Sequence, residues 1–490
     1  MLFQKPRLVI AALRGGAGKT LLTLGLIAAW NRHRGIRVVP FKKGPDYIDA
    51  GWLALAAQHP CYNLDAFLMS AANMWRSFVE RSMGGDAAVV EGNRGLFDGV
   101  DVEGSCSTAE LAKLLGAPVV LVLDATKTTR TAAAQVLGCQ HLDPAVKISG
   151  VILNRVAGKR HEQVVRGAIE RYCNVPVLGV IPKEKGNFFP ERHLGLIPPQ
   201  EHDRIDEAMG FAADMAHDCM DLDGLWDIAS QAEPMGMATS TPVRAFSFTG
   251  RRPVIGVLRD AAFQFYYPDN LEALAEGGAI LVEVSALEDG QLPVLDALYI
   301  GGGFPETHLQ QLAGNERFRL SLKAAIDCGL PVYAECGGLM FLCRGIFQQT
   351  NYFPMAGVFP LDVVMEPKPQ GHGYTVLECI GDNPFFPKGQ QLRGHEFHYS
   401  RIVAGAESLP LVFRLSKGQG IVNGWDGLCY KNTLASYTHL HALGNDFWVE
   451  AMVRNALQFR KQEDSLPEPA ASSRNSGLRV LQVNKRQTIM

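Results

Sequence analysis

The sequence predicts an α/β protein made of two successive parallel-sheet units, and three observations lead to this expectation. Short apolar runs alternate with amphipathic segments from the start of the chain to about residue 200. A second series of the same kind begins at Val254. This rhythm is typical of β-α units around a parallel sheet. Between the two series, residues 231–252 are rich in Pro, Gly, Ser and Thr without periodicity, which indicates a linker.

The apolar runs have the length of buried strands. In the first series they are 8–13, 38–41, 87–91, 119–124, 148–154 and 177–181. In the second they are 254–258, 279–284, 297–300 and 332–334, and the series closes near residue 458. The 490 residues exceed the usual domain length of about 100 to 200 residues. We therefore expect domains at 1–230 and 253–460, a linker at 231–252, and a disordered tail at 461–490, which lacks a continuous apolar face.

Composition excludes several classes of protein. The chain is 47% hydrophobic and 20% charged, with a formal net charge of −3, which is typical of soluble enzymes and not of nucleic-acid binders. Its apolar runs are shorter than the roughly 18 residues of a membrane span, and no signal peptide follows Met1. The ten cysteines form no Cys-x-x-Cys pair, so neither a zinc site nor a disulfide framework is expected. We expect a cytoplasmic protein that binds neither nucleic acid nor membrane.

A phosphate-binding loop follows the first predicted strand. The run Arg14-Gly15-Gly16-Ala17-Gly18-Lys19-Thr20 precedes an apolar helix pattern. In such loops glycines let backbone N–H groups approach phosphates, the lysine neutralises their charge, and the threonine hydroxyl reaches magnesium. We predict that Gly15, Gly16, Gly18, Lys19 and Thr20 bind ATP. Leu13 replaces the first glycine of a strict Walker A motif, so the match is to variant P-loops with a basic residue before Gly-Gly.

Carboxylates and an amide follow other predicted strands, at the ends where ligands bind in such sheets. We predict that Glu91 and Thr20 hold magnesium and that Asp46, Asp49 and Asp98 orient the substrate. Turn chemistry in the loop is the alternative for Glu91 and Asp98, and a solvated loop is the alternative for the charged segment 42–49. The amide of Asn154 can pair with an adenine edge, so we predict that it contacts ATP.

A second site is predicted around Cys336, which lies between a strand-like run and two glycines. This pattern is typical of a nucleophile elbow, which exposes the sulfur and points a helix N-terminus at it, favouring thiolate. Backbone N–H groups of Gly302, Gly303 and Gly337 are predicted to form an oxyanion hole. The general base is either His439 or His441. A buried structural cysteine is the alternative.

These motifs resemble the cobyrinic acid a,c-diamide synthase family, a branch of the cobalamin-pathway amidotransferases. Further segments similar to the family are 44–49, 191–196, 265–270, 301–306, 334–340 and 393–400. With the P-loop, they follow one consistent order from residue 8 to about residue 443. The resemblance implies an N-terminal P-loop parallel-sheet ATP domain, similar to dethiobiotin synthetase, followed by a class I glutamine amidotransferase domain with a flavodoxin-like α/β fold.

The resemblance also implies an activity, namely ATP- and glutamine-dependent amidation of the a and c acetate carboxylates of cobyrinic acid. Cys336 would release ammonia from glutamine with the help of His439, and ammonia would displace phosphate from an acyl phosphate. The usual class I glutamate, two residues after the histidine, is replaced by His441. The branch therefore resembles a Cys-His dyad, with His439 as the first choice of base and His441 as the second. The implied partners are cobyrinic acid or a related tetrapyrrole, ATP with Mg²⁺, and L-glutamine, and a homodimer is compatible with them.

Two alternatives remain open. Relatives of the same architecture amidate siroheme or nickel sirohydrochlorin, which carry the same acetate side chains, and motifs around ATP and glutamine do not separate these substrates. A different class is a P-loop regulatory ATPase with an inactive amidotransferase-like domain. The presence of Cys336, Gly337 and His439 argues against it, because a binding module needs no nucleophile elbow.

Overall fold

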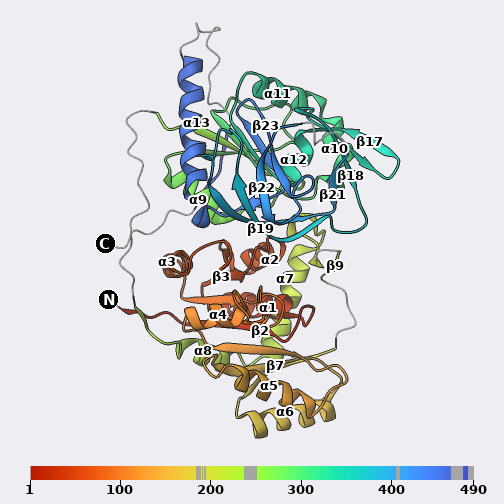
Figure 1. Cartoon of the computed structure of the whole chain (residues 1–490). Coiled ribbons are helices and arrows are strands. Elements are labelled where there is room, and N and C mark those ends of the chain that lie inside the picture. The colour runs from red at the N-terminus through yellow and green to blue at the C-terminus, as the bar shows by residue number, and fades with distance from the viewer. Residues whose placement is uncertain are drawn as a thin grey trace. The chain divides into compact units, whose positions relative to one another are not determined.

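The computed structural model describes residues 2–183, 189, 191–192, 195–236, 251–403, 409–464 and 478–483. The chain forms two compact units, which divide between residues 241 and 242 (Figure 1). That position lies inside the predicted linker 231–252, of which residues 237–250 are outside the described part. The predicted limits of the domains stay a prediction.

The first unit is built on a seven-stranded sheet in which all neighbouring strands are parallel. In spatial order the strands are β4 (Tyr62–Leu64), β3 (Val38–Lys43), β5 (Ala87–Glu91), β2 (Arg7–Ala12), β6 (Val119–Asp124), β7 (Ile148–Val156) and β8 (Val177–Pro182). Six of them match the predicted runs, and β4 is an addition. The strands are almost wholly buried, as expected for a parallel sheet covered on both faces.

Helices alternate with these strands (Figure 1). They are α1 (Lys19–Arg34), α2 (Ile48–Ala57), α3 (Ala71–Ser82), α4 (Thr108–Leu114), α5 (Thr131–Leu142), α6 (Lys159–Cys173), α7 (Ile205–Cys219) and α8 (Leu222–Ser230), with the short helix η1 (Pro199–Glu201). Two antiparallel pairs complete the unit, β1 (Leu2–Phe3) with β11 (Met235–Gly236) and β9 (Glu191–Arg192) with β10 (Gly195–Leu196). His193 and Leu194, within the family-like segment 191–196, lie outside the described residues.

The second unit contains an eleven-stranded mixed sheet. In spatial order its strands are β25 (His439–Leu440), β20 (Gln391–His398), β19 (Gly371–Cys379), β22 (Leu411–Lys417), β23 (Trp425–Tyr430), β24 (Thr433–Ser436), β15 (Val332–Glu335), β14 (Ala297–Ile300), β12 (Val254–Leu258), β13 (Ile280–Val284) and β26 (Arg479–Val480). The five strands from β24 to β13 are mutually parallel. Counted along the chain, their order is that of a flavodoxin-like sheet, so the predicted fold class is confirmed.

A smaller sheet and several helices surround this core (Figure 1). The sheet has the order β17 (Asn351–Pro354), β16 (Cys343–Gln348), β18 (Phe359–Met365) and β21 (Ser400–Ile402). The helices are α9 (Pro268–Glu276), α10 (Leu309–Gly314), α11 (Glu316–Asp327), α12 (Gly337–Leu342) and α13 (Asp446–Asp464), with the short helices η2 (Pro305–Thr307) and η4 (Ala442–Gly444).

The segment 478–483 differs from the expectation of a disordered tail. Its strand β26 pairs antiparallel with β13, and Arg479 forms an ion pair of 2.7 Å with Asp289. The N–H of Leu481 also donates to the carbonyl of Leu281. Without this segment β13 would be an edge strand with unpaired backbone groups, which explains the pairing. The prediction for the tail is therefore wrong at residues 478–483.

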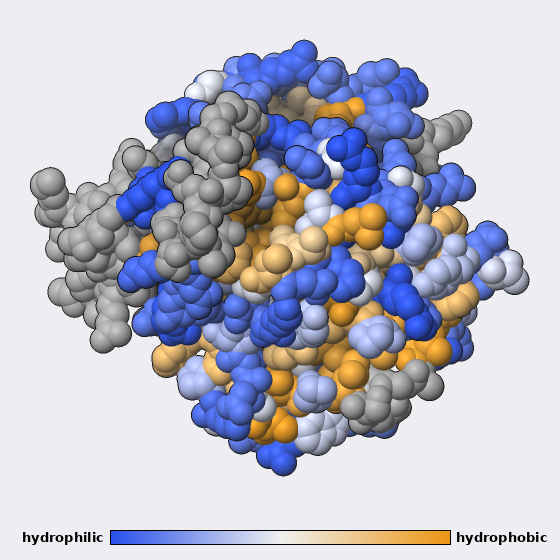
Figure 2. Space-filling model, turned by 90° about the horizontal axis from the view of Figure 1, so that it is seen from above, coloured by the Kyte–Doolittle hydropathy of each residue, from blue (hydrophilic) through white to orange (hydrophobic). Residues whose placement is uncertain are grey.

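Apolar and polar side chains are interspersed on the face of the molecule that Figure 2 shows. Apolar atoms contribute roughly 55–60% of the accessible surface of folded proteins, so exposed apolar side chains are normal. In the described part of the chain, no helix combines the length and the apolar character that crossing a bilayer requires.

Candidate active sites

The P-loop connects β2 to α1 at the carboxyl end of the first sheet. Gly16 and Gly18 have φ angles of +69° and +92°, in the left-handed region that favours glycine. A Cβ at position 18 would also collide with the amide of Asn154. At Gly15 and Gly16, in contrast, a Cβ would meet no described atom within 4 Å. The loop therefore combines an obligatory glycine with open space over its backbone, as a phosphate cradle requires.

Lys19 begins α1 and is largely buried. Its Nζ donates to the backbone carbonyls of Arg94, at 2.9 Å, and Arg14, at 3.3 Å. Burial lowers the pKa of Lys19, and the nearby Glu91 carboxylate opposes this shift. Only neutral carbonyls accept hydrogen bonds from Nζ in the described contacts, so a bound phosphate would supply the opposite charge that favours the ammonium.

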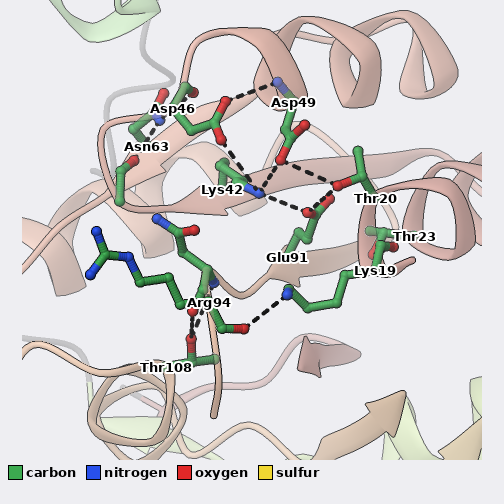
Figure 3. A network of polar contacts seen from close by, with 12 residues as sticks. Lys19, Thr20, Thr23, Lys42, Asp46, Asp49, Asn63, Glu91, Arg94 and Thr108 are labelled. Atoms are coloured by element: carbon green, nitrogen blue, oxygen red, sulfur yellow. Dashed lines mark hydrogen bonds and ion pairs between the residues drawn. The ribbon is translucent and has the colours of Figure 1, made fainter. Parts of the chain in front are cut away.

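Lys42 lies at the centre of an ion network at the ends of β3 and β5 (Figure 3). Its Nζ is 2.6 Å from Asp49 Oδ2, 2.7 Å from Glu91 Oε1 and 3.8 Å from Asp46 Oδ2. Lys42 and Glu91 are direct partners across the two strands, which explains how buried side chains of opposite charge meet. Although burial disfavours the charged form, the three carboxylates raise the pKa of Lys42 well above its usual value.

The hydroxyl of Thr20 joins the same carboxylates. Its Oγ1 is 2.9 Å from Glu91 Oε1 and 3.2 Å from Asp49 Oδ2. The other oxygen of Glu91, Oε2, is buried without a hydrogen-bond partner among the described residues. Burial raises the pKa of Glu91, while Lys42 lowers it. An orphaned carboxylate oxygen beside a hydroxyl and a second carboxylate fits Mg²⁺, which prefers oxygen ligands.

No cluster of three or more His, Cys, Asp or Glu side chains in the described ranges forms a metal site by itself. This agrees with the usual binding of Mg²⁺ in nucleotide sites, where one or two carboxylates act together with phosphates and water. Thr20 and Glu91 thus lie together as the sequence predicts, and Asp49 joins them. From sequence, Asp49 is predicted to orient the substrate, because residue spacing alone does not reveal that it lies 3.2 Å from Thr20 Oγ1.

The other predicted residues of this unit have mixed surroundings. Burial and the neighbouring Asp49 raise the pKa of Asp46 to about 7. Asp98 is exposed, and its carboxylate accepts a hydrogen bond from the N–H of Gly95 at 2.8 Å, which is the alternative turn role. The Nδ2 of Asn154 donates to the Ala17 carbonyl at 2.8 Å, and its Oδ1 accepts from the N–H of Arg155 at 2.9 Å. An amide has two donors and two acceptor lone pairs, so these bonds leave capacity for an adenine edge.

In the second unit, Cys336 lies at a sharp turn between β15 and α12. Its φ of +48° and ψ of −99° are unusual for a residue with a side chain and cost about 1 to 3 kcal/mol. The turn is held because the N–H of Cys336 donates to the Ser436 carbonyl at 2.8 Å. A Cβ on Gly338 would come within 2.8 Å of Ile300, so the helix packs against β14 only with glycine there. This is the geometry of a nucleophile elbow.

The three predicted oxyanion-hole glycines lie together. A Cβ on Gly337 would lie 3.1 Å from the backbone nitrogen of Gly303 and 3.5 Å from the carbonyl carbon of Gly302. The Gly302 carbonyl accepts hydrogen bonds of 3.0 Å from the N–H groups of Gln264 and Phe265, which fixes the orientation of the loop. Residues 301–303, here called the glycine loop, therefore lie next to the elbow that carries the Cys336 sulfur.

The surroundings of Cys336 act against the thiolate that the elbow pattern favours. Burial raises the pKa of the thiol, and the carboxylates of Glu306, Glu335 and Glu396 raise it further. A hydrogen bond with the Gly337 backbone acts in the opposite direction but does not reverse the shift. Helix α12 has only six residues, and its N-terminus does not compensate for the loss of water. If Cys336 acts as a nucleophile, a neighbouring base is therefore needed to accept its proton.

The two candidate bases have different surroundings. A Cβ on Gly302 would lie 2.5 Å from Cε1 and 3.2 Å from Nε2 of His439, so this ring edge faces the glycine loop. His441 is fully buried, and its Nδ1 accepts from the N–H of Leu443 at 3.2 Å. Its Nε2 is 3.6 Å from Asp269 Oδ2. Because His439 lies beside the glycine loop, it is favoured over His441 as the candidate base.

The antiparallel strands bring residues to this site that sequence reasoning did not assign. The Phe397 carbonyl in β20 lies 3.9 Å from Cys336 Sγ. Beside it, the buried Glu396 accepts from the N–H groups of Gln419, at 2.6 Å, and Gly420, at 2.9 Å. The ring of His398 stacks on Tyr437 at a centroid distance of 3.7 Å. For Glu396, Phe397 and His398 the sequence signals were the similarity of segment 393–400 to the family and its His-x-x-His spacing, which favoured a polar loop at the catalytic cleft. The segment lies beside Cys336, but it forms strand β20 and not a loop.

Comparison with known proteins agrees with the two units. Residues 8–196 match the CobQ/CobB/MinD/ParA nucleotide binding domain, and residues 254–447 match the CobB/CobQ-like glutamine amidotransferase domain. The chain is 42% identical over 473 residues to the cobyrinate a,c-diamide synthase of Magnetococcus marinus, covering 96% of this chain and 100% of the relative. It is 39% identical over 454 residues to that of Archaeoglobus fulgidus, covering 92% and 98%. The chain belongs to the cobyrinate a,c-diamide synthase family.

Proposed function

We propose that the protein converts the a and c acetate carboxylates of cobyrinic acid to amides in cobalamin biosynthesis, using ATP and glutamine in the cytoplasm. The observation that carries this proposal is the similarity to relatives named cobyrinate a,c-diamide synthase over nearly the whole chain. Two further features support it, namely a P-loop beside buried carboxylates in one unit and a nucleophile elbow in the other.

In the second unit, Sγ of Cys336 attacks the side-chain amide carbon of glutamine, and His439 accepts the thiol proton. The N–H groups of the glycine loop and Gly337 stabilise the oxygen that becomes negative. His439 then returns the proton to the leaving nitrogen, ammonia departs, and a glutamyl thioester remains on Cys336. Water cleaves the thioester and releases glutamate.

In the first unit, a carboxylate oxygen of the substrate attacks the γ-phosphorus of ATP, and ADP leaves. The resulting acyl phosphate has a good leaving group, so ammonia attacks its carbonyl carbon and phosphate departs. Lys19 and the P-loop N–H groups hold the phosphates. Thr20, Glu91 and Asp49 are the residues that would hold Mg²⁺, which when bound screens the phosphate charge. Two rounds give the a,c-diamide.

Asp46 is proposed to orient the substrate. Because the pKa of Asp46 is raised to about 7, its acid form is well populated near neutral pH. A neutral carboxylic acid donates a hydrogen bond to a carboxylate, whereas an ionised one repels it. Asp46 is thus suited to hold one of the acetate groups of a polycarboxylate substrate, while Lys42 supplies the positive charge beside it.

The experiment is to incubate the full chain with ATP, Mg²⁺ and glutamine and to offer cobyrinic acid, siroheme and nickel sirohydrochlorin in parallel. Mass spectrometry then counts the amides formed on each ring. We expect two amides on cobyrinic acid. Product from siroheme or nickel sirohydrochlorin alone would overturn the substrate, and absence of both amidation and glutamine hydrolysis would overturn the reaction class.

A further inference from the structure

His439 faces a buried carboxylate, although the usual class I glutamate two residues later is replaced by His441. Oε2 of Glu335 is 3.5 Å from His439 Nδ1, and both side chains are almost completely buried. Glu335 is the last residue of β15 and immediately precedes Cys336. The proposed nucleophile and this carboxylate are therefore consecutive residues. Their side chains have different neighbours, because Glu335 lies beside His439 Nδ1 and Cys336 Sγ lies near the Phe397 carbonyl.

Glu335 is held firmly in place by two neighbouring strands. Its Oε1 accepts a hydrogen bond of 2.9 Å from the N–H of Leu440, the residue after His439. Its Oε2 accepts from the hydroxyl of Tyr299 in β14 at 3.0 Å. The carbonyl of Leu440 in turn accepts from Nδ2 of Asn270 at 2.9 Å. Both backbone groups of Leu440, its N–H and its carbonyl, are thus hydrogen-bonded. The Glu335 carboxylate accepts from this N–H and also lies beside the His439 ring.

Other carboxylates near the site have different contacts. Glu396 accepts two backbone N–H groups and lies 3.6 Å from Nε2 of His398. Asp269 lies against His441. The 3.5 Å between Glu335 and His439 is longer than a good hydrogen bond, and catalytic hydrogen bonds are often long before the substrate binds.

We propose that Glu335 is the positioning residue of the glutaminase, and that it takes the role of the missing glutamate by holding His439 with the proton on Nδ1. This inference rests on the proposed glutaminase function. With Nδ1–H directed at Glu335, Nε2 faces the glycine loop as an acceptor. When the Cys336 proton moves to Nε2, the imidazolium is stabilised by the carboxylate, and the proton then leaves with ammonia.

The main test is Glu335→Gln in the full chain. The amide oxygen of the new side chain can still accept from Leu440, but its NH₂ group would donate to Nδ1. That contact places the histidine proton on Nε2, where it prevents acceptance of the thiol proton. We expect kcat for glutamine hydrolysis to fall on the order of 10²- to 10⁴-fold with KM for glutamine nearly unchanged. Amidation driven by free ammonia should persist, because it does not use this site.

Asp269→Asn is the matched control, because Asp269 is the other buried acid beside a histidine in this unit. We expect this variant to keep its glutaminase kcat. Loss of kcat in Asp269→Asn with normal hydrolysis in Glu335→Gln would assign the orienting role to the other pair and overturn the inference. A wild-type chain that does not hydrolyse glutamine would overturn the proposed function and the inference with it.

Two further measurements separate orientation from a merely structural role. In ¹⁵N-labelled protein, the His439 signal should report a protonated Nδ1 in the wild type and a protonated Nε2 in Glu335→Gln. An unchanged tautomer would contradict the inference. If Glu335→Gln does not fold, Tyr299→Phe removes one hydrogen bond to the carboxylate without touching His439. We expect kcat to fall about tenfold, as for one hydrogen bond to a charged group, and an unchanged kcat would overturn the inference.

Discussion

The two units place their sites at the same end of a parallel sheet but hold the reactive groups in opposite ways. In the first unit, buried charges are balanced by other charges, with Lys42 between Glu91 and Asp49. In the second, the proposed nucleophile Cys336 is a buried thiol whose pKa is raised, and it lies beside backbone groups of glycines. One site carries permanent charge, and the other has a neutral nucleophile.

The difference follows from the chemistry of the two proposed reactions. Phosphates carry negative charge before, during and after transfer, so fixed positive groups are useful throughout. Amide hydrolysis develops its negative charge only in the transition state, and preorganised N–H dipoles stabilise that charge without attracting other anions beforehand. The carboxyl edge of a parallel sheet can therefore serve both purposes, depending on which side chains follow the strands.

Replacing Lys19 gives the largest expected effect and tests whether permanent charge is essential only in the first unit. In Lys19→Ala, the P-loop loses the cation that faces the phosphates. We expect amidation to fall by at least about 10³-fold with either glutamine or ammonia as nitrogen source. Glutamine hydrolysis measured without the tetrapyrrole should persist. Retained ammonia-dependent amidation would contradict the proposed role of the P-loop, because it would show that ATP chemistry does not need Lys19.

Replacing Cys336 tests the reverse separation. Cys336→Ala removes the nucleophile, so glutamine hydrolysis and glutamine-dependent amidation should be lost. Amidation driven by ammonium chloride should continue at close to the wild-type rate, because the first unit keeps all its groups. The measurement is product formation with each nitrogen source in the same preparation. Loss of both activities in a folded variant would contradict the assignment of two separate sites.

Much of this arrangement was predictable because the parallel strands are long apolar runs. Predicted strands 87–91, 119–124 and 254–258 agree with β5, β6 and β12 residue by residue. The P-loop and the elbow were also recognisable, since local spacing determines both. Strands β16 to β23 were not predicted, because exposed or half-buried residues interrupt them and leave no long buried apolar run.

The contacts that sequence could not predict are those between distant segments. Glu335 and His439 are 104 positions apart by number, and no spacing rule relates them. Likewise, Thr20, Asp49 and Glu91 come from different β-α connections, so that only the strand order brings them together. The raised pKa of the Cys336 thiol was not predicted, because a helix N-terminus is visible in sequence, whereas the burial that raises the thiol pKa is not.

Lys42→Met removes the charge balance of the first unit. Asp49 and Glu91 would lose their common cation, and a buried carboxylate without its partner is strongly destabilising. We expect the first unit to lose about 3 to 5 kcal/mol of stability, seen by calorimetry as a lower unfolding temperature. Lys113→Met removes a more exposed ion pair with Asp143 and should cost less than about 1 kcal/mol. Equal effects of the two variants would contradict the central role of Lys42.

The acidity of Asp46 predicts a pH dependence of stability for the first unit. Because burial and Asp49 raise the pKa of Asp46 to about 7, the folded state retains a proton that the unfolded state releases near pH 4. Stability from this group therefore falls as the pH rises from about 4 to about 7. Asp46→Asn should flatten the decline in unfolding temperature over this window.

Asp86 provides a control of opposite sign. Its hydrogen bonds with Arg37 lower the pKa of Asp86, so its stabilisation is present above the usual range of an aspartate and is lost as the pH falls. Asp86→Asn should therefore remove stability at neutral pH and change little in strong acid. A parallel response of the two variants would contradict the assignment of a raised pKa to Asp46.

Asn154→Ala has the smallest expected effect and separates two roles of one amide. If Asn154 only braces the P-loop through the Ala17 carbonyl, the variant should use ATP and GTP with equally raised KM values. If it also reads the adenine edge, as predicted, ATP should lose about 1 to 3 kcal/mol of binding while GTP is little affected. We expect the second result, because the bonds to Ala17 and Arg155 leave one donor and one lone pair for the base. Steady-state kinetics of ammonia-dependent amidation with both nucleotides would decide, since this assay does not depend on the glutaminase unit.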